Sequence, residues 1–92
     1  MTERVLENIY MRLINLSDKC TRCEINVKDA QAEIINIMNV VIVEYNTIIK
    51  NEFMNEIHIV LSKIIFSNSL EMIINELNKL LELIKRIIIE LK

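Results

Sequence analysis

Neither glycine nor proline occurs in this chain of 92 residues. Glycine supplies the positive φ angles of tight turns and phosphate-binding loops, and proline sets the geometry of many other turns, so motifs built on these two residues are excluded. The structures that remain possible are helices joined by short polar links. Because apolar residues recur at helical spacing along most of the chain, we expect an all-α fold that forms one helical domain over residues 1–92.

The chain also lacks an excess of charge of either sign. It has 11 basic and 13 acidic residues, a net charge of −2, whereas capture of nucleic acid normally needs a concentrated basic patch. Charged residues near the start of the chain interrupt the apolar segment that a signal peptide needs. The uncharged run 34–43 is shorter than the ~20 apolar residues that are needed to cross a bilayer. We therefore expect an intracellular protein, cytoplasmic or nuclear. Frequent isoleucine and asparagine are typical of AT-rich genomes, such as those of many viruses and parasites.

The first half of the chain predicts two helices separated by the polar stretch 19–24. Asn26 followed by Asp29 has the spacing of a capping box and marks the start of the second helix. The β-branched run 40–43 favours a strand, but the 3.6-residue period around it indicates a helix. The apolar stripes are Leu6, Ile9, Leu13 and Leu16 in the first helix, residues 3–18, and Ile34, Met38, Val41, Tyr45 and Ile48 in the second.

A third stripe is shifted in phase and predicts a break near residues 50–52, with Asn51 as the cap. A single helix over residues 27–66 is the alternative. Asn68 followed by Glu71 repeats the capping spacing and starts the last helix. The expected architecture is a small antiparallel bundle of four helices, or of three if 27–66 is continuous. The third stripe is Phe53, Ile57, Val60, Leu61 and Ile64.

The last helix carries apolar residues in alternating steps of four and three. This 3.5-residue period is typical of the seam of a coiled coil or bundle, and it predicts a coiled-coil-like C-terminal helix. The predicted seam is Leu70, Ile74, Leu77, Leu81, Ile84, Ile88 and Leu91.

The chain has more apolar residues than one small domain readily buries. They make up 52% of the sequence, while a domain of this size hides only somewhat more than about 60% of its unfolded surface. Some fall outside the main stripes, as aligned pairs on three helices, and a second stripe permits a second packing partner. We therefore expect an interface with another chain at Val40, Val43, Ile59, Phe66, Met72 and Leu83.

One motif has chemical content, Cys20-Thr21-Arg22-Cys23. Two thiolates at this spacing bind one side of a tetrahedral zinc ion or close a disulfide, and neighbouring basic side chains favour the thiolate. A zinc site needs four ligands and His58 is the only histidine, so zinc at Cys20 and Cys23 requires a second chain. That arrangement is similar to the zinc-hook apex of the long coiled-coil DNA-repair ATPases, whose usual proline and long coils this chain lacks. Incidental thiols, intersubunit zinc and a redox pair remain open.

No residues form a recognisable catalytic constellation in the sequence. Glu52 and Glu56 share a helical face at the spacing of ordinary solvated carboxylates, and the four arginines fall at or beyond the rims of the apolar arcs. We therefore expect a non-enzymatic helical module for protein–protein interaction. It would be an oligomerising scaffold or a small adaptor subunit of a larger complex.

Two other functions are alternatives. A small helical regulator of nucleic acid, similar to the plasmid copy-number bundles that read RNA shape, would gather lysines of different helices on one face. A protein of the membrane surface would turn the basic residues of its last helix towards lipid headgroups. The residues concerned are Lys28, Lys50, Lys63 and Lys79 for nucleic acid, and Lys79, Lys85, Arg86 and Lys92 for lipid.

Overall fold

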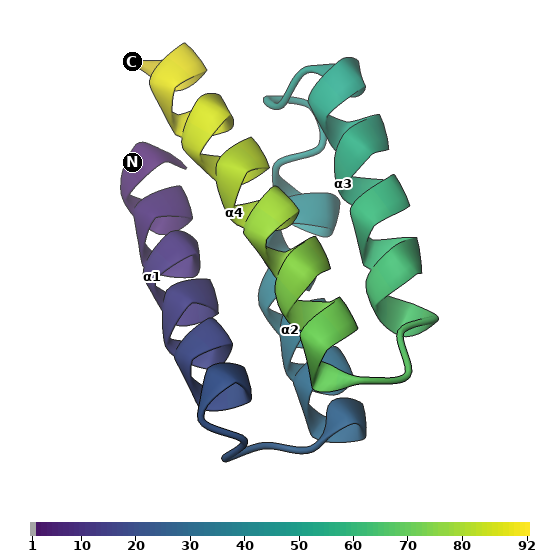
Figure 1. Cartoon of the computed structure of the whole chain (residues 1–92). Coiled ribbons are helices and arrows are strands. Elements are labelled where there is room, and N and C mark those ends of the chain that lie inside the picture. The colour runs from purple at the N-terminus through teal and green to yellow at the C-terminus, as the bar shows by residue number, and fades with distance from the viewer. Residues whose placement is uncertain (1) are drawn as a thin grey trace.

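The computed structural model describes residues 2–92, which fold into four α-helices arranged as an antiparallel bundle (Figure 1). The predicted all-α bundle is thereby confirmed. The alternative of one helix over residues 27–66 is wrong, because the chain turns between the second and third helices. The helices are α1 (Thr2–Thr21), α2 (Val27–Glu44), α3 (Asn51–Ile65) and α4 (Leu70–Leu91).

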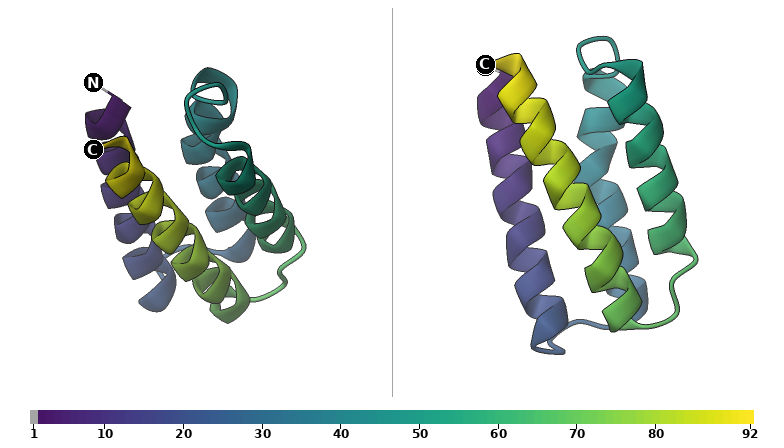
Figure 2. Two further views of the ribbon diagram at one scale, coloured as in Figure 1. Left: turned by 90° about the horizontal axis from the view of Figure 1, so that it is seen from above. Right: turned by 45° about the horizontal axis from the view of Figure 1, so that its top comes forward.

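Helix α4 is central to the packing. It lies beside α1 on one side and α3 on the other, and α2 closes the back of the bundle (Figure 2). The bundle measures 35 × 21 × 18 Å. Helix α1 begins and α4 ends at the same end of it, and the α3–α4 link lies at the opposite end (Figure 1). Residues 2–92 contain no bilayer-spanning segment, since each helix is too short or too polar to serve as one.

Apolar side chains from all four helices of residues 2–92 form a shared core. In α4 the predicted 3.5-residue spacing is present, but its phase differs from the prediction. Of the expected seam, Leu77 and Ile84 are buried, whereas the other members are half-buried at the edge of the core: Leu70, Ile74, Leu81, Ile88 and Leu91. Because α4 packs between two neighbours, its buried arc is broad, and Ile73, Leu80 and Ile87 take the core positions predicted for the residues that follow them. The buried residues of α4 are Ile73, Leu77, Leu80, Leu83, Ile84 and Ile87.

The link between α1 and α2 begins with a Schellman motif. Helix α1 continues to Thr21, three residues beyond the predicted end, and Cys23 then adopts a positive φ of 55°. The amide of Glu24 donates to the Lys19 carbonyl at 2.9 Å, and the amide of Cys23 donates to the Cys20 carbonyl at 3.1 Å. These are the two bonds of the motif, whose left-handed position is usually glycine. In a chain without glycine, a cysteine occupies it.

The predicted cap of α2 is confirmed. The Asp29 amide donates to Asn26 Oδ1 at 2.8 Å, and Asn26 Nδ2 donates in turn to Asp29 Oδ2 at 3.1 Å. For the next two helices, the observed N-cap is one residue away from the predicted one. Lys50, not Asn51, is the N-cap of α3 and makes no side-chain capping bond. Ser69, not Asn68, caps α4, since its Oγ accepts from the Met72 amide at 3.2 Å.

The second helix ends earlier than its stripe predicts. The amides of Ile48 and Ile49 both donate to the Tyr45 carbonyl, at 3.2 and 3.1 Å, so the chain is already in a turn there. This turn reverses the expected order of burial, because Ile49 enters the core and Ile48 is exposed. The break between α2 and α3 therefore covers residues 45–50 and begins before the predicted position.

Candidate interaction surface

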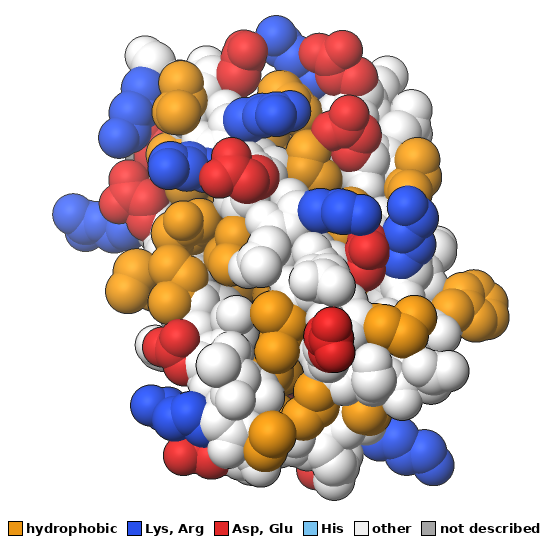
Figure 3. Space-filling model, viewed as in Figure 1, with side chains coloured by type: hydrophobic (Ala, Val, Ile, Leu, Met, Phe, Trp, Pro, Cys, Tyr) orange, Lys and Arg blue, Asp and Glu red, His pale blue; other side chains and the backbone are white. Residues whose placement is uncertain are grey.

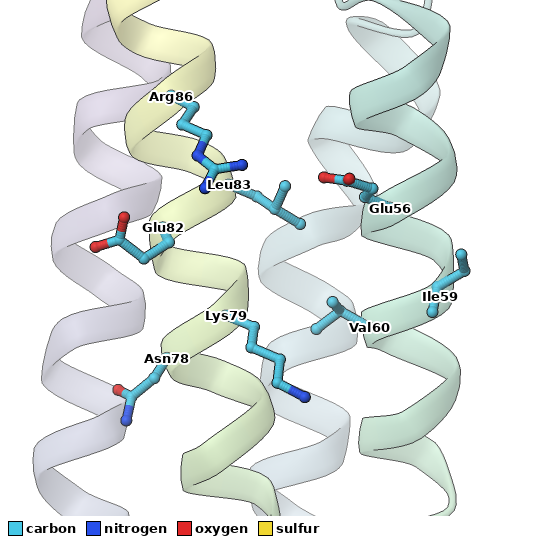
Figure 4. A pocket seen from close by; sticks show the side chains of 8 residues that line it. All are labelled: Glu56, Ile59, Val60, Asn78, Lys79, Glu82, Leu83 and Arg86. Carbon is cyan, nitrogen blue, oxygen red and sulfur yellow. The ribbon is translucent and has the colours of Figure 1, made fainter.

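A groove of about 510 Å³, here called the wide groove, runs between α3 and α4. Val60 from α3 and Leu83 from α4 extend into it and supply apolar side chains (Figure 4). Glu56 and Arg86 extend towards each other from opposite rims. The groove is thus apolar within and charged at its edges, which is the arrangement of a surface that receives a side chain or helix from another molecule. The α3 rim includes Glu56, Ile59 and Val60, and the α4 rim includes Lys79, Leu83 and Arg86.

A second hollow, the link pocket, lies nearer the α3–α4 link and has a volume of about 300 Å³. It exceeds the ~150 Å³ cavity that holds a benzene ring. Phe66 and Met72 contribute its apolar surface, and Lys63 and Glu76 contribute opposite charges. We call the wide groove and the link pocket together the α3–α4 face. The link pocket is lined by Lys63, Phe66, Ser67, Met72, Asn75 and Glu76.

Phe66 is the most exposed large apolar side chain recorded in residues 2–92, at 83%. It is the C-cap of α3, so it lies where the chain leaves the helix. The next residue, Ser67, is buried and donates its hydroxyl to the Lys63 carbonyl at 2.8 Å. The side-chain amide of Gln31 in α2 donates to carbonyls at the same end of α3, including that of Ser67 at 2.9 Å. These bonds hold the end of α3 in place while Phe66 projects into solvent.

The charges of the α3–α4 face are only partly paired. Lys79 Nζ lies 3.1 Å from Glu76 Oε2 within α4. Glu76 Oε1 is shielded from solvent and has no hydrogen-bond partner among residues 2–92. Over the same residues, neither Glu56 nor Arg86 has an oppositely charged group within 4.0 Å. Acidic and basic side chains intermingle on this side of the molecule, with apolar side chains between them (Figure 3).

Of the six residues predicted to lie at an interface, the structure gathers four on the α3–α4 face. Phe66 and Met72 share the link pocket, and Ile59 lies on the α3 rim of the wide groove. Ile59 is 55% and Met72 is 45% exposed. The prediction that Leu83 lies outside the core is wrong. Leu83 is only 6% exposed, because the broad buried arc of α4 includes it.

The predicted pair on α2 lies elsewhere. Val43 is exposed and Val40 is half-buried, and neither lines the wide groove or the link pocket. Helical wheels also missed several exposed apolar residues. Ile48 follows the end of α2, where the helical phase assumed by the wheel no longer applies, and Ile65 is the last residue of α3. The exposed apolar residues not predicted are Met11, Ile48, Ile65 and Ile89.

Comparisons with known proteins do not add to these observations. No family model matches the chain, and neither curated proteins nor solved structures gave a match. The function proposed below therefore rests on the residues of the α3–α4 face.

The two cysteines have different environments. Cys20 is in the core, at 1% exposure, and Cys23 is exposed in the α1–α2 link. Burial, and to a smaller extent the charge of Cys23, raises the pKa of the Cys20 thiol. The expected promotion of the thiolate is therefore wrong for Cys20. Residues 2–92 contain no cluster of three or more metal-binding side chains. Intersubunit zinc stays a prediction, and it would require Cys20 to leave the core.

The lysines named for binding nucleic acid come from three helices, α2, α3 and α4. Lys28 lies in the first turn of α2 and Lys50 is the N-cap of α3, and Lys50 and Lys79 are each in an ion pair, with Glu90 and Glu76 respectively. In α4, the apolar side that a membrane-surface helix would insert into lipid is packed against the other helices. These placements give neither alternative further support.

Proposed function

We propose that this protein is a non-enzymatic helical module for protein–protein interaction, and that the α3–α4 face binds another polypeptide chain. The observation that carries the proposal is the exposure of Phe66 beside the link pocket, next to the wide groove with its apolar interior. A scaffold that assembles copies of itself and an adaptor that joins a larger complex would both use such a face.

The apolar residues set the scale of the interaction. Burying one large apolar side chain contributes about 1.5 to 3 kcal/mol, and Ile59, Phe66 and Met72 project from this face. Association costs an estimated ~4 to 15 kcal/mol in lost freedom and ordering. Three side chains alone therefore give marginal binding, and the charged rims and the remaining area of the face must contribute the rest. Phe66 is the expected hot spot, because exposed aromatic anchors dominate such interfaces.

Site-specific photo-crosslinking tests this function. A photoreactive phenylalanine analogue at position 66 should give a discrete adduct, in the purified chain if the partner is a second copy and in a lysate of the native source if it is another protein. The same analogue at Val43, an exposed apolar residue of α2, is the matched control and should give little or none. The masses of the adducts separate the two kinds of partner, since the chain itself is 10.9 kDa.

Loss of binding on substitution completes the test. Phe66→Ser should weaken the interaction by about tenfold or more while leaving the urea midpoint unchanged, because the side chain contributes little to the core. Absence of any adduct from position 66, or equal adducts from positions 66 and 43, would contradict the proposed function.

A further inference from the structure

We propose that the α3–α4 face binds a second copy of this chain, related by a two-fold axis parallel to α3 and α4. The inference rests on the proposed function, since it names the partner of the same face. It is carried by the distribution of charge on the two rims. At each of two levels along the face, one rim is acidic and the other is basic.

The first level is the wide groove. Glu56 of α3 and Arg86 of α4 extend into it from opposite sides, and neither has an ion-pair partner among residues 2–92 (Figure 4). Glu82, the other acidic residue recorded there, projects from the side of α4 away from α3 in the same view. The α3 rim is therefore acidic at this level, and the α4 rim is basic.

The second level is the link pocket, where the signs are exchanged. Lys63 comes from α3 and Glu76 comes from α4. Glu76 has one carboxylate oxygen bound to Lys79 and one buried oxygen without a partner in the described residues. Along the face, the α3 rim changes from acidic to basic, and the α4 rim changes from the unpaired Arg86 to Glu76, whose charge Lys79 partly offsets.

Such a face is complementary to itself. Rotation by 180° about an axis parallel to the helices keeps every residue at its level but lays the α3 rim of one copy over the α4 rim of the other. Glu56 then meets Arg86 of the second copy, and Lys63 meets Glu76, each contact occurring twice by symmetry. Opposite charges placed in this way set the register of an interface and exclude misaligned pairings.

The apolar residues decide between this axis and one perpendicular to the helices. A perpendicular axis also opposes unlike charges, but it inverts the levels and brings Phe66 towards the start of α3, where the pocket beside Phe53 is smaller, about 220 Å³, and is flanked by the Lys50–Glu90 ion pair. The parallel axis brings Phe66 to the level of Met72 and the link pocket of the second copy. It therefore matches apolar surface with apolar surface as well as charge with charge.

The dimensions of the bundle set an upper limit on the interface. The bundle is 35 Å long and 21 Å across its wider transverse dimension. The whole of that side approaches the ~800 Å² per partner that stable protein complexes bury, and the α3–α4 face is part of it, so the dimer is expected at the small end of the range.

Charge exchange between copies provides the test. The masses of the full chain, of Glu56→Arg and of Arg86→Glu would be measured by light scattering over a range of concentrations. We expect a dimer for the wild type and a dissociation constant raised about tenfold or more for each variant, because each substitution opposes like charges twice. An equimolar mixture of the two variants should form a heterodimer with an affinity near that of the wild type.

The mixture distinguishes contacts between copies from contacts within one copy. If Glu56 paired only with Arg86 of its own chain, mixing would restore nothing. Lys85→Glu, adjacent to Arg86 but outside the groove lining, is the control and should dimerise as the wild type does. Circular dichroism of each variant confirms that it is folded.

A wild type that stays monomeric at millimolar concentration would overturn the inference, as would a mixture no tighter than its components. Rescue of Glu56→Arg by Lys63→Glu instead of Arg86→Glu would overturn the parallel axis. If the wild type is monomeric but position 66 crosslinks to a different protein, the proposed function stands and this inference alone fails.

Discussion

Gln31 donates its side-chain amide to the backbone carbonyl of Ser67 across 2.9 Å, which ties α2 to the end of α3. The same nitrogen lies 3.0 Å from the Ile64 carbonyl and 3.1 Å from that of Ile65. The last carbonyls of a helix lack partners within the helix, and a glycine after the helix commonly allows the backbone to satisfy them. In this chain, which has no glycine, a side chain from a neighbouring helix does so.

Removing that amide should destabilise the bundle. Gln31→Met keeps the length of the side chain but leaves carbonyls unpaired, and we expect a loss of about 1 to 2 kcal/mol in the free energy of unfolding by urea. Gln31→Glu should cost more, because a carboxylate accepts hydrogen bonds and repels carbonyl oxygens. Equal stability of Gln31→Glu and the wild type would show that these hydrogen bonds do not stabilise the fold.

Cys23 should be replaceable by glycine with a gain in stability. A left-handed conformation costs an L-residue roughly 1 to 2 kcal/mol, whereas glycine adds about 0.5 to 1 kcal/mol of unfolded-state entropy. The difference predicts that Cys23→Gly stabilises the protein by about 0.5 to 1 kcal/mol in urea titrations. Cys23→Ala removes the thiol but keeps the strain and is the control, expected within about 0.5 kcal/mol of the wild type. If Cys23→Ala stabilised the protein as much as Cys23→Gly, the positive φ of Cys23 would not be the cause of the strain.

The raised pKa of the Cys20 thiol predicts a dependence of stability on pH. The folded state retains this proton at pH values where the unfolded chain, with an ordinary thiol pKa of 9.0, releases it. The contribution to stability is therefore complete below that value and is lost as the pH rises through the folded-state pKa. The urea midpoint should fall more steeply between about pH 8 and pH 10 in the wild type than in Cys20→Ala. Parallel slopes would contradict the prediction.

Ser69 should contribute more to the stability of the fold than its neighbour Asn68, which the capping pattern predicted as the cap. Ser69→Ala removes the hydroxyl that accepts from the Met72 amide and should cost about 1 kcal/mol of unfolding free energy. Asn68→Ala should change that free energy by less than about 0.5 kcal/mol, because Asn68 is exposed and has no recorded side-chain hydrogen bond among residues 2–92. Thermal denaturation of the two variants side by side compares them directly, and the reverse order would restore Asn68 as the cap.

Two adjacent leucines test the phase of α4. Leu80 is fully buried and Leu81 is half-buried at the edge of the core. Leu80→Ala should lower the unfolding free energy by about 2 to 5 kcal/mol, because it leaves a cavity. Leu81→Ala should lower it by less, since part of that side chain is already in water. A larger loss for Leu81 in urea titrations would favour the seam predicted from the heptad spacing.

Local patterns accounted for most of the fold. The apolar stripes predicted the helices, and the spacing of Asn26 and Asp29 predicted a cap whose hydrogen bonds lie within four residues of chain. The phase of α4 was not predictable in this way. A stripe reports which side of a helix is apolar, but the number of neighbouring helices decides how wide the buried arc becomes, and α4 has one on each side.

The candidate surface was predictable only in part. Helical wheels identified Ile59, Phe66 and Met72 as apolar residues outside the main stripes, and they are exposed. The charge pattern of the face was not visible in the sequence, because Glu56 and Arg86 are thirty residues apart and come together only through the packing of α3 on α4. Gln31 escaped notice for the same reason, since its partners lie 33 to 36 residues away.

The bundle begins and ends at one pole, away from the α3–α4 link. In the proposed dimer, rotation about an axis parallel to the helices preserves that polarity, so all four chain ends emerge on one side of the assembly. If a domain were fused to either terminus, the two copies of that domain in the dimer would be held close together on the same side of the assembly. A fluorophore pair attached at the two C-termini would report that proximity by energy transfer.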